Sequence, residues 1–307
     1  MKTVVITGPT GAIGTALMGN FIEKGIHVYA VVRKDSSRLE RIPESPLITP
    51  VLLGLDELQG LKNQISVSCD VFYHFAWAGT IGDGRNDVYL QNQNVKYTLD
   101  AVRAAAELGC KRFVGAGSQA EYGRTEGLLS PDTPAFPENG YGMAKLCAGH
   151  MSRLLCEQLG IEHVWGRILS VYGPRDGAKT MIMSAIDSFL RDRCPRFTKG
   201  EQLWDYLYSK DAAQAMYLLG EKGVNGKVYC LGSGHARPLA EYITILRNSI
   251  DSALKMELGA VPYSPKQVMY LCADIKTLRE DTGFEPEYSF EQGIKETIAW
   301  YREEMGK

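Results

Sequence analysis

A glycine-rich turn near the N-terminus restricts the fold of this chain more than any other feature. Residues 8–14 read Gly-Pro-Thr-Gly-Ala-Ile-Gly, directly after the apolar run at residues 4–6 and before a stretch with helical spacing of apolar residues. A glycine turn between strand and helix lets the chain bend tightly and leaves backbone N–H groups to face an anion. The turn therefore predicts a βα unit with a dinucleotide site, and the alternative is a turn that needs glycine for steric reasons alone.

Short β-branched runs alternate with longer helix-like stretches over the first 170 or so residues. The predicted helices end near glycines, as helices commonly do. This alternation predicts an α/β fold of the Rossmann type, in which helices cover both faces of a doubly wound parallel sheet. Strands are predicted at residues 4–6, 27–32, 71–75, 112–115 and 163–168, and helices at residues 15–24, 94–108 and 141–159.

The regular alternation stops after the Tyr-Gly-Pro at residues 172–174. We therefore predict that residues 1–170 form the dinucleotide-binding domain. Residues 171–202 and 233–307 are predicted to form a smaller α/β substrate-binding lobe. Residues 203–232 again read as strand, helix and strand, and we expect them to return to the first domain.

The charge balance argues against a polyanionic partner. The chain carries 34 Lys and Arg against 36 Asp and Glu, for a formal charge of -2. Such a chain has no overall positive field to attract nucleic acid or an anionic membrane. Its seven cysteines are scattered and never form a CxxC pair, which predicts reduced thiols and no metal site. With no signal-peptide pattern and no membrane-spanning apolar stretch, the expected location is the cytoplasm.

The end of the second predicted strand indicates which dinucleotide would bind. An acidic residue at this point binds the ribose 2′-hydroxyl of NAD. Here Val32 ends the strand, and Arg33 and Lys34 follow it. Cationic side chains suit the 2′-phosphate of NADP, so NADP is predicted and NAD is less favoured. The alternative is a solvated basic turn.

Tyr141, Lys145 and Ser118 predict that the protein reduces a carbonyl group or oxidises an alcohol. Tyr141 and Lys145 are four residues apart on a predicted helix, so they share one face. A neighbouring ammonium lowers the pKa of a phenol toward the range where it exchanges protons with a carbonyl or an alcohol. Ser118 follows the fourth predicted strand, where its hydroxyl can polarise a carbonyl. The alternatives are an exposed helix pair and a turn-capping serine.

The glycine turn, Ser118, Tyr141 and Lys145, in this order, resemble the extended short-chain dehydrogenase/reductase superfamily of nucleotide-sugar epimerases, dehydratases and 4-ketoreductases. Residues 74–78 (His-Phe-Ala-Trp-Ala) and residues 167–174 resemble it too. The resemblance implies that Ser118, Tyr141 and Lys145 are catalytic, that His74 is a buried strand residue, and that helices 94–108 and 141–159 form a homodimer contact. The implied cofactor-binding residues are Gly8, Thr10, Gly11, Ala12, Ile13, Gly14, Arg33, Lys34, Ala76, Trp77, Ala78, Tyr141, Lys145 and Ile168.

The two residues after Ser118 indicate which reaction of the superfamily this chain catalyses. Dehydratases of the superfamily carry an acid and a base there, whereas this chain has Gln119 and Ala120, which cannot shuttle protons. Epimerases of the superfamily usually hold NAD, whereas Arg33 and Lys34 indicate NADPH, which is oxidised and released in each reaction cycle. Residues 117–123 also resemble those of deoxyhexose 4-ketoreductases. The resemblance therefore implies NADPH-dependent reduction of a nucleotide-linked 4-keto-6-deoxyhexose with Tyr141 as proton donor.

The substrate lobe departs from the family pattern. Members that bind nucleoside diphosphates often have arginines where this chain has Trp204 and Ser264. Either other side chains bind the diphosphate in place of these arginines, or the substrate is a non-sugar ketone or aldehyde. A 4-epimerase with tightly bound NAD(P) and a noncatalytic NADP sensor are the further alternatives. The predicted substrate-binding residues are Glu121, which is alternatively a loop cap, and Ser170, Arg175, Lys199, Trp204 and Arg237.

Overall fold

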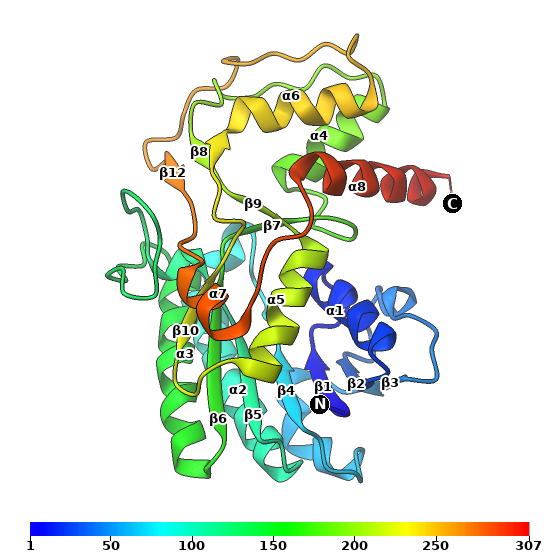
Figure 1. Ribbon diagram of the computed structural model, residues 1–307, viewed down its shortest axis with the longest axis vertical. Coiled ribbons are helices and arrows are strands. Elements are labelled where there is room, and N and C mark those ends of the chain that lie inside the picture. The colour runs from blue at the N-terminus through cyan, green and yellow to red at the C-terminus, as the bar shows by residue number, and fades with distance from the viewer. Residues whose placement is uncertain (307) are drawn as a thin grey trace.

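A seven-stranded parallel sheet forms the centre of the computed structural model, which describes residues 1–306 (Figure 1). Its strand order is β10-β6-β5-β4-β1-β2-β3, and every neighbouring pair is parallel. This arrangement confirms the predicted doubly wound α/β fold. The strands are β1 (Thr3–Thr7), β2 (His27–Val32), β3 (Ile48–Leu52), β4 (Val71–His74), β5 (Arg112–Ser118), β6 (Glu162–Ile168) and β10 (Val228–Leu231).

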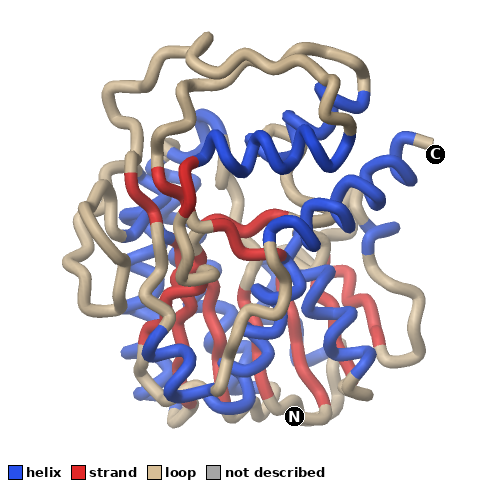
Figure 2. The backbone as a smooth tube through the Cα atoms, turned by 45° about the horizontal axis from the view of Figure 1, so that its top comes forward, coloured by secondary structure: helices blue, strands red, loops and turns tan. Residues whose placement is uncertain are grey.

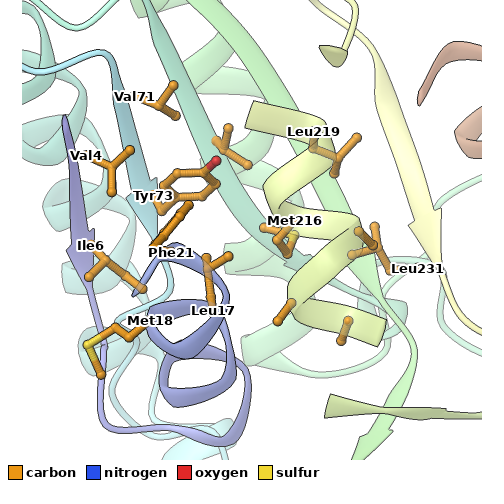
Figure 3. Packing of buried hydrophobic residues seen from close by; sticks show 14 of the residues in the cluster. Val4, Ile6, Leu17, Met18, Phe21, Val71, Tyr73, Met216, Leu219 and Leu231 are labelled. Carbon is orange, nitrogen blue, oxygen red and sulfur yellow. The ribbon is translucent and has the colours of Figure 1, made fainter. Parts of the chain in front are cut away.

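Helices cover both faces of this sheet because the side chains of each buried strand alternate between two cores. Val4 and Ile6 point into a core that they share with α1 (Ala12–Glu23) and α5 (Ser209–Lys222), as Figure 3 shows. Val5, between them, packs into a second core with the helix α2 (Val88–Glu107). The remaining helical elements on the sheet are α3 (Gly140–Leu159), α7 (Lys276–Thr282), η1 (Leu39–Arg41), η2 (Leu55–Asn63), η3 (Gly82–Arg85) and η4 (Gln119–Glu121).

The strand order brings the ends of β1, β2 and β4 together. Thr7 at the end of β1 is level with Val31 of β2 on one side and with His74 of β4 on the other. The chain runs from β1 outward to β3 and then returns to the other side of β1, so the strand order reverses there. Ligands of doubly wound folds bind outside the carboxyl ends of the strands at such a reversal.

A smaller lobe lies beyond the carboxyl ends of these strands, at the top of Figure 1, while the N-terminus lies at the far end of the sheet in Figure 2. Its three long helices pack around a separate apolar core rich in tyrosine. Its elements are β7 (Ser170–Tyr172), α4 (Met181–Leu190), β8 (Leu203–Trp204), β9 (Tyr206–Tyr208), β11 (Arg237–Pro238), α6 (Leu239–Ile250), β12 (Tyr270–Leu271) and α8 (Phe290–Met305).

Residues 203–232 are expected to return to the first domain; α5 and β10 lie on the central sheet, whereas β8 and β9 belong to the smaller lobe. Two further elements differ from the sequence expectations. Strand β3 is not predicted, and it contains Pro50. It pairs only with β2, at the sheet edge, where proline is tolerated because one side of the strand needs no ladder hydrogen bonds. Helix α2 begins at Val88, because the side chain of Asp87 caps it by accepting from two backbone N–H groups. None of the helices within residues 1–306 is long and apolar enough to cross a membrane.

Candidate active site

The glycine turn after β1 is packed so tightly that two of its glycines cannot be replaced without displacing backbone. Gly8 has a φ of +73°, and a Cβ there would lie 2.7 Å from the backbone nitrogen of Ala76. A Cβ on Gly14 would lie 2.5 Å from the carbonyl oxygen of Gly8. The absence of side chains at these glycines lets α1 lie close against the ends of β1 and β4, as a dinucleotide-binding turn requires.

Gly11 differs from its neighbours because the chain itself leaves space beside it. The nearest atom to a Cβ at Gly11 would be the carbonyl oxygen of Gly8, at 3.9 Å. Gly11 is the N-cap of α1, no side chain caps this end, and the first turn of the helix contains no acidic residue. The helix start therefore offers backbone N–H groups and open space to an anion, and a pyrophosphate fits this cradle.

Arg33 and Lys34, which are predicted to bind the 2′-phosphate, follow the end of β2, and their side chains are free to contact a bound molecule. The side chains of Arg33 and Lys34 are 69% and 67% exposed. Their acidic neighbours are distant, since Arg33 Nε lies 3.8 Å from Asp35 and Lys34 Nζ lies 3.7 Å from Glu57. Exposed pairs of this length contribute little, so either cation can turn to an anionic ligand.

A further arginine, not predicted from the sequence, contacts the glycine turn. Arg41 Nη1 donates to the carbonyl oxygens of Thr10 and Arg175, each at 3.4 Å. Burial lowers the pKa of Arg41, and the positive charges of Arg38 and Arg175 lower it further. Neither its distance in sequence from the turn nor its place in a short 3-10 helix marks it as a site residue.

The segment after β4 is fixed by side chains of α2. The amide of Asn94 both accepts from Ala78 N at 3.0 Å and donates to Ala78 O at 2.9 Å. Trp77 Nε1 donates to Gln91 at 2.8 Å, which leaves the indole ring beside Tyr141 in an edge-on contact. The predicted residues Ala76, Trp77 and Ala78 therefore line the switch point between β1 and β4.

His74 lies below this segment and is a buried strand residue. Its Nδ1 lies 2.8 Å from the hydroxyl of Thr7, and its Nε2 lies 3.4 Å from that of Thr98. Burial lowers the pKa of His74 to about 3, so the imidazole is neutral at physiological pH. It stabilises the strand ends and is not placed for proton transfer.

Ser118 ends β5 and caps the short helix η4. Its hydroxyl accepts from Ala120 N at 3.2 Å, while its own N–H donates to Glu121 Oε1 at 2.8 Å. The carboxylate of Glu121 is 1% exposed and also bonds Trp165 Nε1 at 3.0 Å and Arg167 Nε at 2.7 Å. Glu121 is thus a loop cap in a buried ion pair. The substrate-binding role predicted for it has no support, because protein donors already occupy both of its oxygens.

Tyr141 lies in the first turn of α3, whose N-cap Asn139 accepts from Gly142 N. Burial raises the pKa of Tyr141, whereas the side chain of Ser118 and the charge of Arg85 lower it. The sequence predicts that the ammonium of Lys145 lowers this pKa. Burial is the larger effect in this structure, and the lowering comes from Ser118 and Arg85.

Lys145 lies one turn further along α3 and is buried beneath the site. Its Nζ donates to Ala116 O at 2.6 Å and lies 3.8 Å above the ring of Trp77. Burial lowers the pKa of Lys145 to about 7, although the charge of Glu121 opposes this effect. Ser118, Tyr141 and Lys145 therefore surround one place at the carboxyl end of β5, next to the segment after β4.

Three of the predicted substrate residues come together at the boundary of the smaller lobe. Trp204 Nε1 donates to the Ser170 hydroxyl at 2.7 Å, and Trp204 is level with Arg237 across the β8–β11 pair. Asp205 follows Trp204 and is fully buried, where it accepts backbone hydrogen bonds from Ser233, Gly234 and Ala273. Asp205 anchors this strand against the loop after β10, a structural role that the sequence analysis did not identify.

The other two predicted substrate residues lie elsewhere. Lys199 is exposed on the loop after α4, with its side chain near Gly259. Arg175 has a left-handed φ of 65° and donates to the carbonyl oxygen of Arg41. It lines a groove of about 480 Å³ between α1 and α5, which none of Ser118, Tyr141 and Lys145 lines. The structure therefore does not group Arg175 and Lys199 with Trp204.

Comparisons with known proteins agree with this geometry. The model of the family described as "NAD dependent epimerase/dehydratase family" matches residues 4–232. The chain is 26% identical to UDP-N-acetyl-alpha-D-glucosaminuronate decarboxylase of Bacillus cytotoxicus, over 98% of each protein. It is also 26% identical to dTDP-glucose 4,6-dehydratase of Xanthomonas campestris pv. campestris, over 62% of this chain and 57% of that protein.

Solved structures share the fold along the whole chain. A UDP-N-acetylglucosamine 4-epimerase from Methanobrevibacter ruminantium superposes with a TM-score of 0.89 at 23% identity, covering 99% of both chains. A dTDP-glucose 4,6-dehydratase from Streptomyces venezuelae with NAD bound superposes with a TM-score of 0.87 at 20% identity, covering 99% of this chain and 98% of that one.

Proposed function

The chain belongs to the NAD dependent epimerase/dehydratase family, a family of enzymes, and we propose that this member reduces a keto sugar with NADPH. The proposed substrate is a nucleotide-linked 4-keto-6-deoxyhexose. The observation that carries the proposal is the meeting of Ser118, Tyr141 and Lys145 beside residues 76–78, with Gln119 and Ala120 after Ser118. These residues can assist reduction of a carbonyl by NADPH but lack the second acid and base that elimination of water needs.

The chain's own residues have separate tasks in this reaction. NADPH, when bound over the glycine turn, supplies the hydride. The Tyr141 hydroxyl donates its proton to the carbonyl oxygen, and burial keeps this phenol protonated at neutral pH. The Ser118 hydroxyl polarises the same oxygen and stabilises the negative charge that develops on it. Lys145 would contact the nicotinamide ribose, and its hydrogen bond to Ala116 O fixes the position of its ammonium group.

The test of the reductase function is a turnover assay. We expect the purified enzyme to oxidise NADPH in the presence of a nucleotide-linked 4-keto-6-deoxyhexose, with one alcohol formed for each NADPH consumed. A binding screen of UDP, dTDP, GDP and CDP in the presence of NADPH identifies the nucleotide. Failure of all four nucleotides to bind would contradict the sugar-nucleotide assignment and favour a non-nucleotide carbonyl, because Trp204 and Ser264 replace two expected arginines.

Cofactor choice gives a separate prediction. Arg33→Asp places an acid at the end of β2, where it repels a 2′-phosphate and accepts from a 2′-hydroxyl. We expect calorimetry to show NADPH affinity falling by about tenfold or more, since one charge-assisted bond contributes ~1.5–3 kcal/mol. NADH affinity should rise. Arg247→Asp makes the same charge change on α6 and should leave both affinities unchanged; an unaltered preference in Arg33→Asp would remove Arg33 from the site.

A 4-epimerase with tightly held cofactor is the second candidate. Solved 4-epimerases share the fold of this chain, as does a solved dTDP-glucose 4,6-dehydratase. Such an enzyme returns the hydride to its substrate and so retains its cofactor. Protein that purifies with bound NAD and interconverts 4-epimers without added NADPH would decide for this alternative. A noncatalytic NADP sensor would show binding without either reaction.

We also propose that the enzyme is a homodimer through α2 and α3. The outer face of α3 exposes Met143, Met151 and Leu154, at positions that share one side of the helix. A second copy of this face would cover these apolar side chains.

A further inference from the structure

Arg85 is a charged residue beside Tyr141, and the roles predicted for Ser118, Tyr141 and Lys145 do not account for it. It ends η3, and its guanidinium carbon lies 4.5 Å from the centre of the Tyr141 ring. Its Nη1 group donates to Thr80 O at 2.9 Å, which holds the guanidinium over this ring. A cation over an aromatic face is attracted by the electron-rich ring.

The loop that carries Arg85 is fastened to the helix that carries Tyr141. The side chain of Asn86 accepts from Gly140 N at 3.1 Å, and a Cβ on Gly140 would lie 3.0 Å from Arg85 O. From α2, the amide of Gln91 donates to two carbonyl oxygens of the loop, at 2.9 and 2.7 Å. The backbone at Arg85 is therefore fixed against the first turn of α3, so the guanidinium is presented to the phenol by a rigid support.

Two cations face the Tyr141 ring, and Arg85 is the nearer one. Lys145 Nζ lies 5.9 Å from the ring centre, against 4.5 Å for the guanidinium carbon of Arg85. Lys145 also interacts closely with the Trp77 ring, and its lowered pKa leaves part of its population neutral at physiological pH. The guanidinium of Arg85 carries a positive charge.

We propose that Arg85 is a positioning residue for Tyr141, which holds the phenol ring in place and supplies the positive charge nearest to it. The proposal rests on the reductase function proposed above, in which Tyr141 is the proton donor. A nearby positive charge stabilises phenolate relative to phenol, so it eases release of the proton to a carbonyl oxygen. The other groups against the phenol are Ser118, whose hydroxyl acts in the same direction, and Glu121, whose charge opposes it.

The sign of the pH effect follows from these charges. Tyr141 must be protonated to act as the acid, so the reduction rate falls as pH rises past the pKa of its phenol. Arg85→Gln removes the stabilising charge and raises that pKa. We expect the alkaline limb of the kcat profile to move to higher pH, because the positive charge of Arg85 lowers the pKa of the phenol. Arg85→Lys, which keeps the charge, should retain most of the wild-type profile.

A second readout needs neither substrate nor cofactor. Protein labelled at the tyrosine Cζ carbon is titrated by NMR, and Tyr141→Phe assigns the Tyr141 signal. We expect this signal to titrate at higher pH in Arg85→Gln than in wild type. Arg124→Gln, which removes an exposed guanidinium paired with Glu138 on a nearby loop, should leave the titration unchanged.

The two readouts separate the two proposals. A shift of the Tyr141 titration in Arg85→Gln without any NADPH-dependent turnover would support the proposed effect of Arg85 on Tyr141. It would also contradict the reductase function. Turnover that falls by the same factor at every pH in Arg85→Gln, with an unshifted Tyr141 signal, would overturn the role of Arg85 and leave the reductase function standing. Identical profiles for Arg85→Gln and Arg85→Lys would also overturn it, because charge would then not matter.

Discussion

Replacement of Tyr141 by phenylalanine is expected to lower kcat for carbonyl reduction about 1,000-fold, since a positioned general acid contributes 10²–10⁴-fold. The hydroxyl is the only part removed, and the ring keeps its contacts with Trp77 and Arg85. The fold should therefore be unaffected. NADPH oxidation followed at saturating substrate measures kcat, and calorimetry on the same protein measures NADPH affinity, which we expect to change little.

The matched control is Tyr89→Phe. Tyr89 is 86% exposed at the start of α2, so the same hydroxyl is removed without a partner in the site. This variant should keep the wild-type rate. If Tyr141→Phe retained kcat within a few-fold of wild type, the proton would have to come from another group. The position of Ser118 would then make its hydroxyl the first candidate.

The predicted strand ends show how far the sequence determines this site. Residues that follow buried parallel strands lie along one edge of the sheet, so the sequence predicts this edge for Gly11, residues 76–78 and Ser118. Their nearness also depends on β1, β4 and β5 being neighbours, which the structure shows. Tyr141 and Lys145 are placed with equal security, because four residues in a helix fix their relative direction. The fold and the relative positions of the candidate catalytic residues can therefore be predicted from local patterns.

The electrostatics of the site were not accessible in the same way. Whether Lys145 or burial has the larger effect on the pKa of the Tyr141 phenol depends on how much water reaches α3. The access of water depends on packing between segments that are distant in the sequence. Arg85 and Arg41 come from short 3-10 helices with no periodicity to reveal them. The sequence does not decide whether Glu121 caps a loop or binds substrate, because its partners, Trp165 and Arg167, are more than 40 positions away.

The smaller lobe was the least predictable part for a related reason. Its strands are two or three residues long, so no alternation of apolar and polar residues can develop within them. They are held by side chains such as the buried carboxylate of Asp205, which collects backbone N–H groups from two separate loops. Arg175 and Lys199 were grouped with Trp204 because of their charge, whereas the chain path separates them.

Three glycines of one turn and helix give the second large prediction, because alanine at each should have a different consequence. Gly11→Ala places a methyl group where the chain leaves open space and where a pyrophosphate would approach. We expect NADPH affinity to fall about 100-fold, equivalent to losing a charge-assisted bond worth ~3 kcal/mol, while stability falls by no more than ~1 kcal/mol for an altered N-cap. Gly14→Ala instead forces its Cβ against the backbone of Gly8 and Pro9, and should destabilise the fold by about 3 kcal/mol.

Gly19 in the middle of α1 supplies the internal control, since a Cβ built there meets no described atom within 4 Å outside its chain neighbours and the backbone of its own helix. Gly19→Ala should stabilise the protein by about 0.5–1 kcal/mol, because alanine loses less backbone entropy in a helix, and it should leave NADPH affinity unchanged. Urea unfolding and calorimetry on the three variants separate folding from binding. A Gly11→Ala protein that binds NADPH as tightly as wild type would show that the space beside Gly11 is not the pyrophosphate cradle. The glycine there would then be retained for turn geometry alone, and the cofactor would have to enter the switch point by another path.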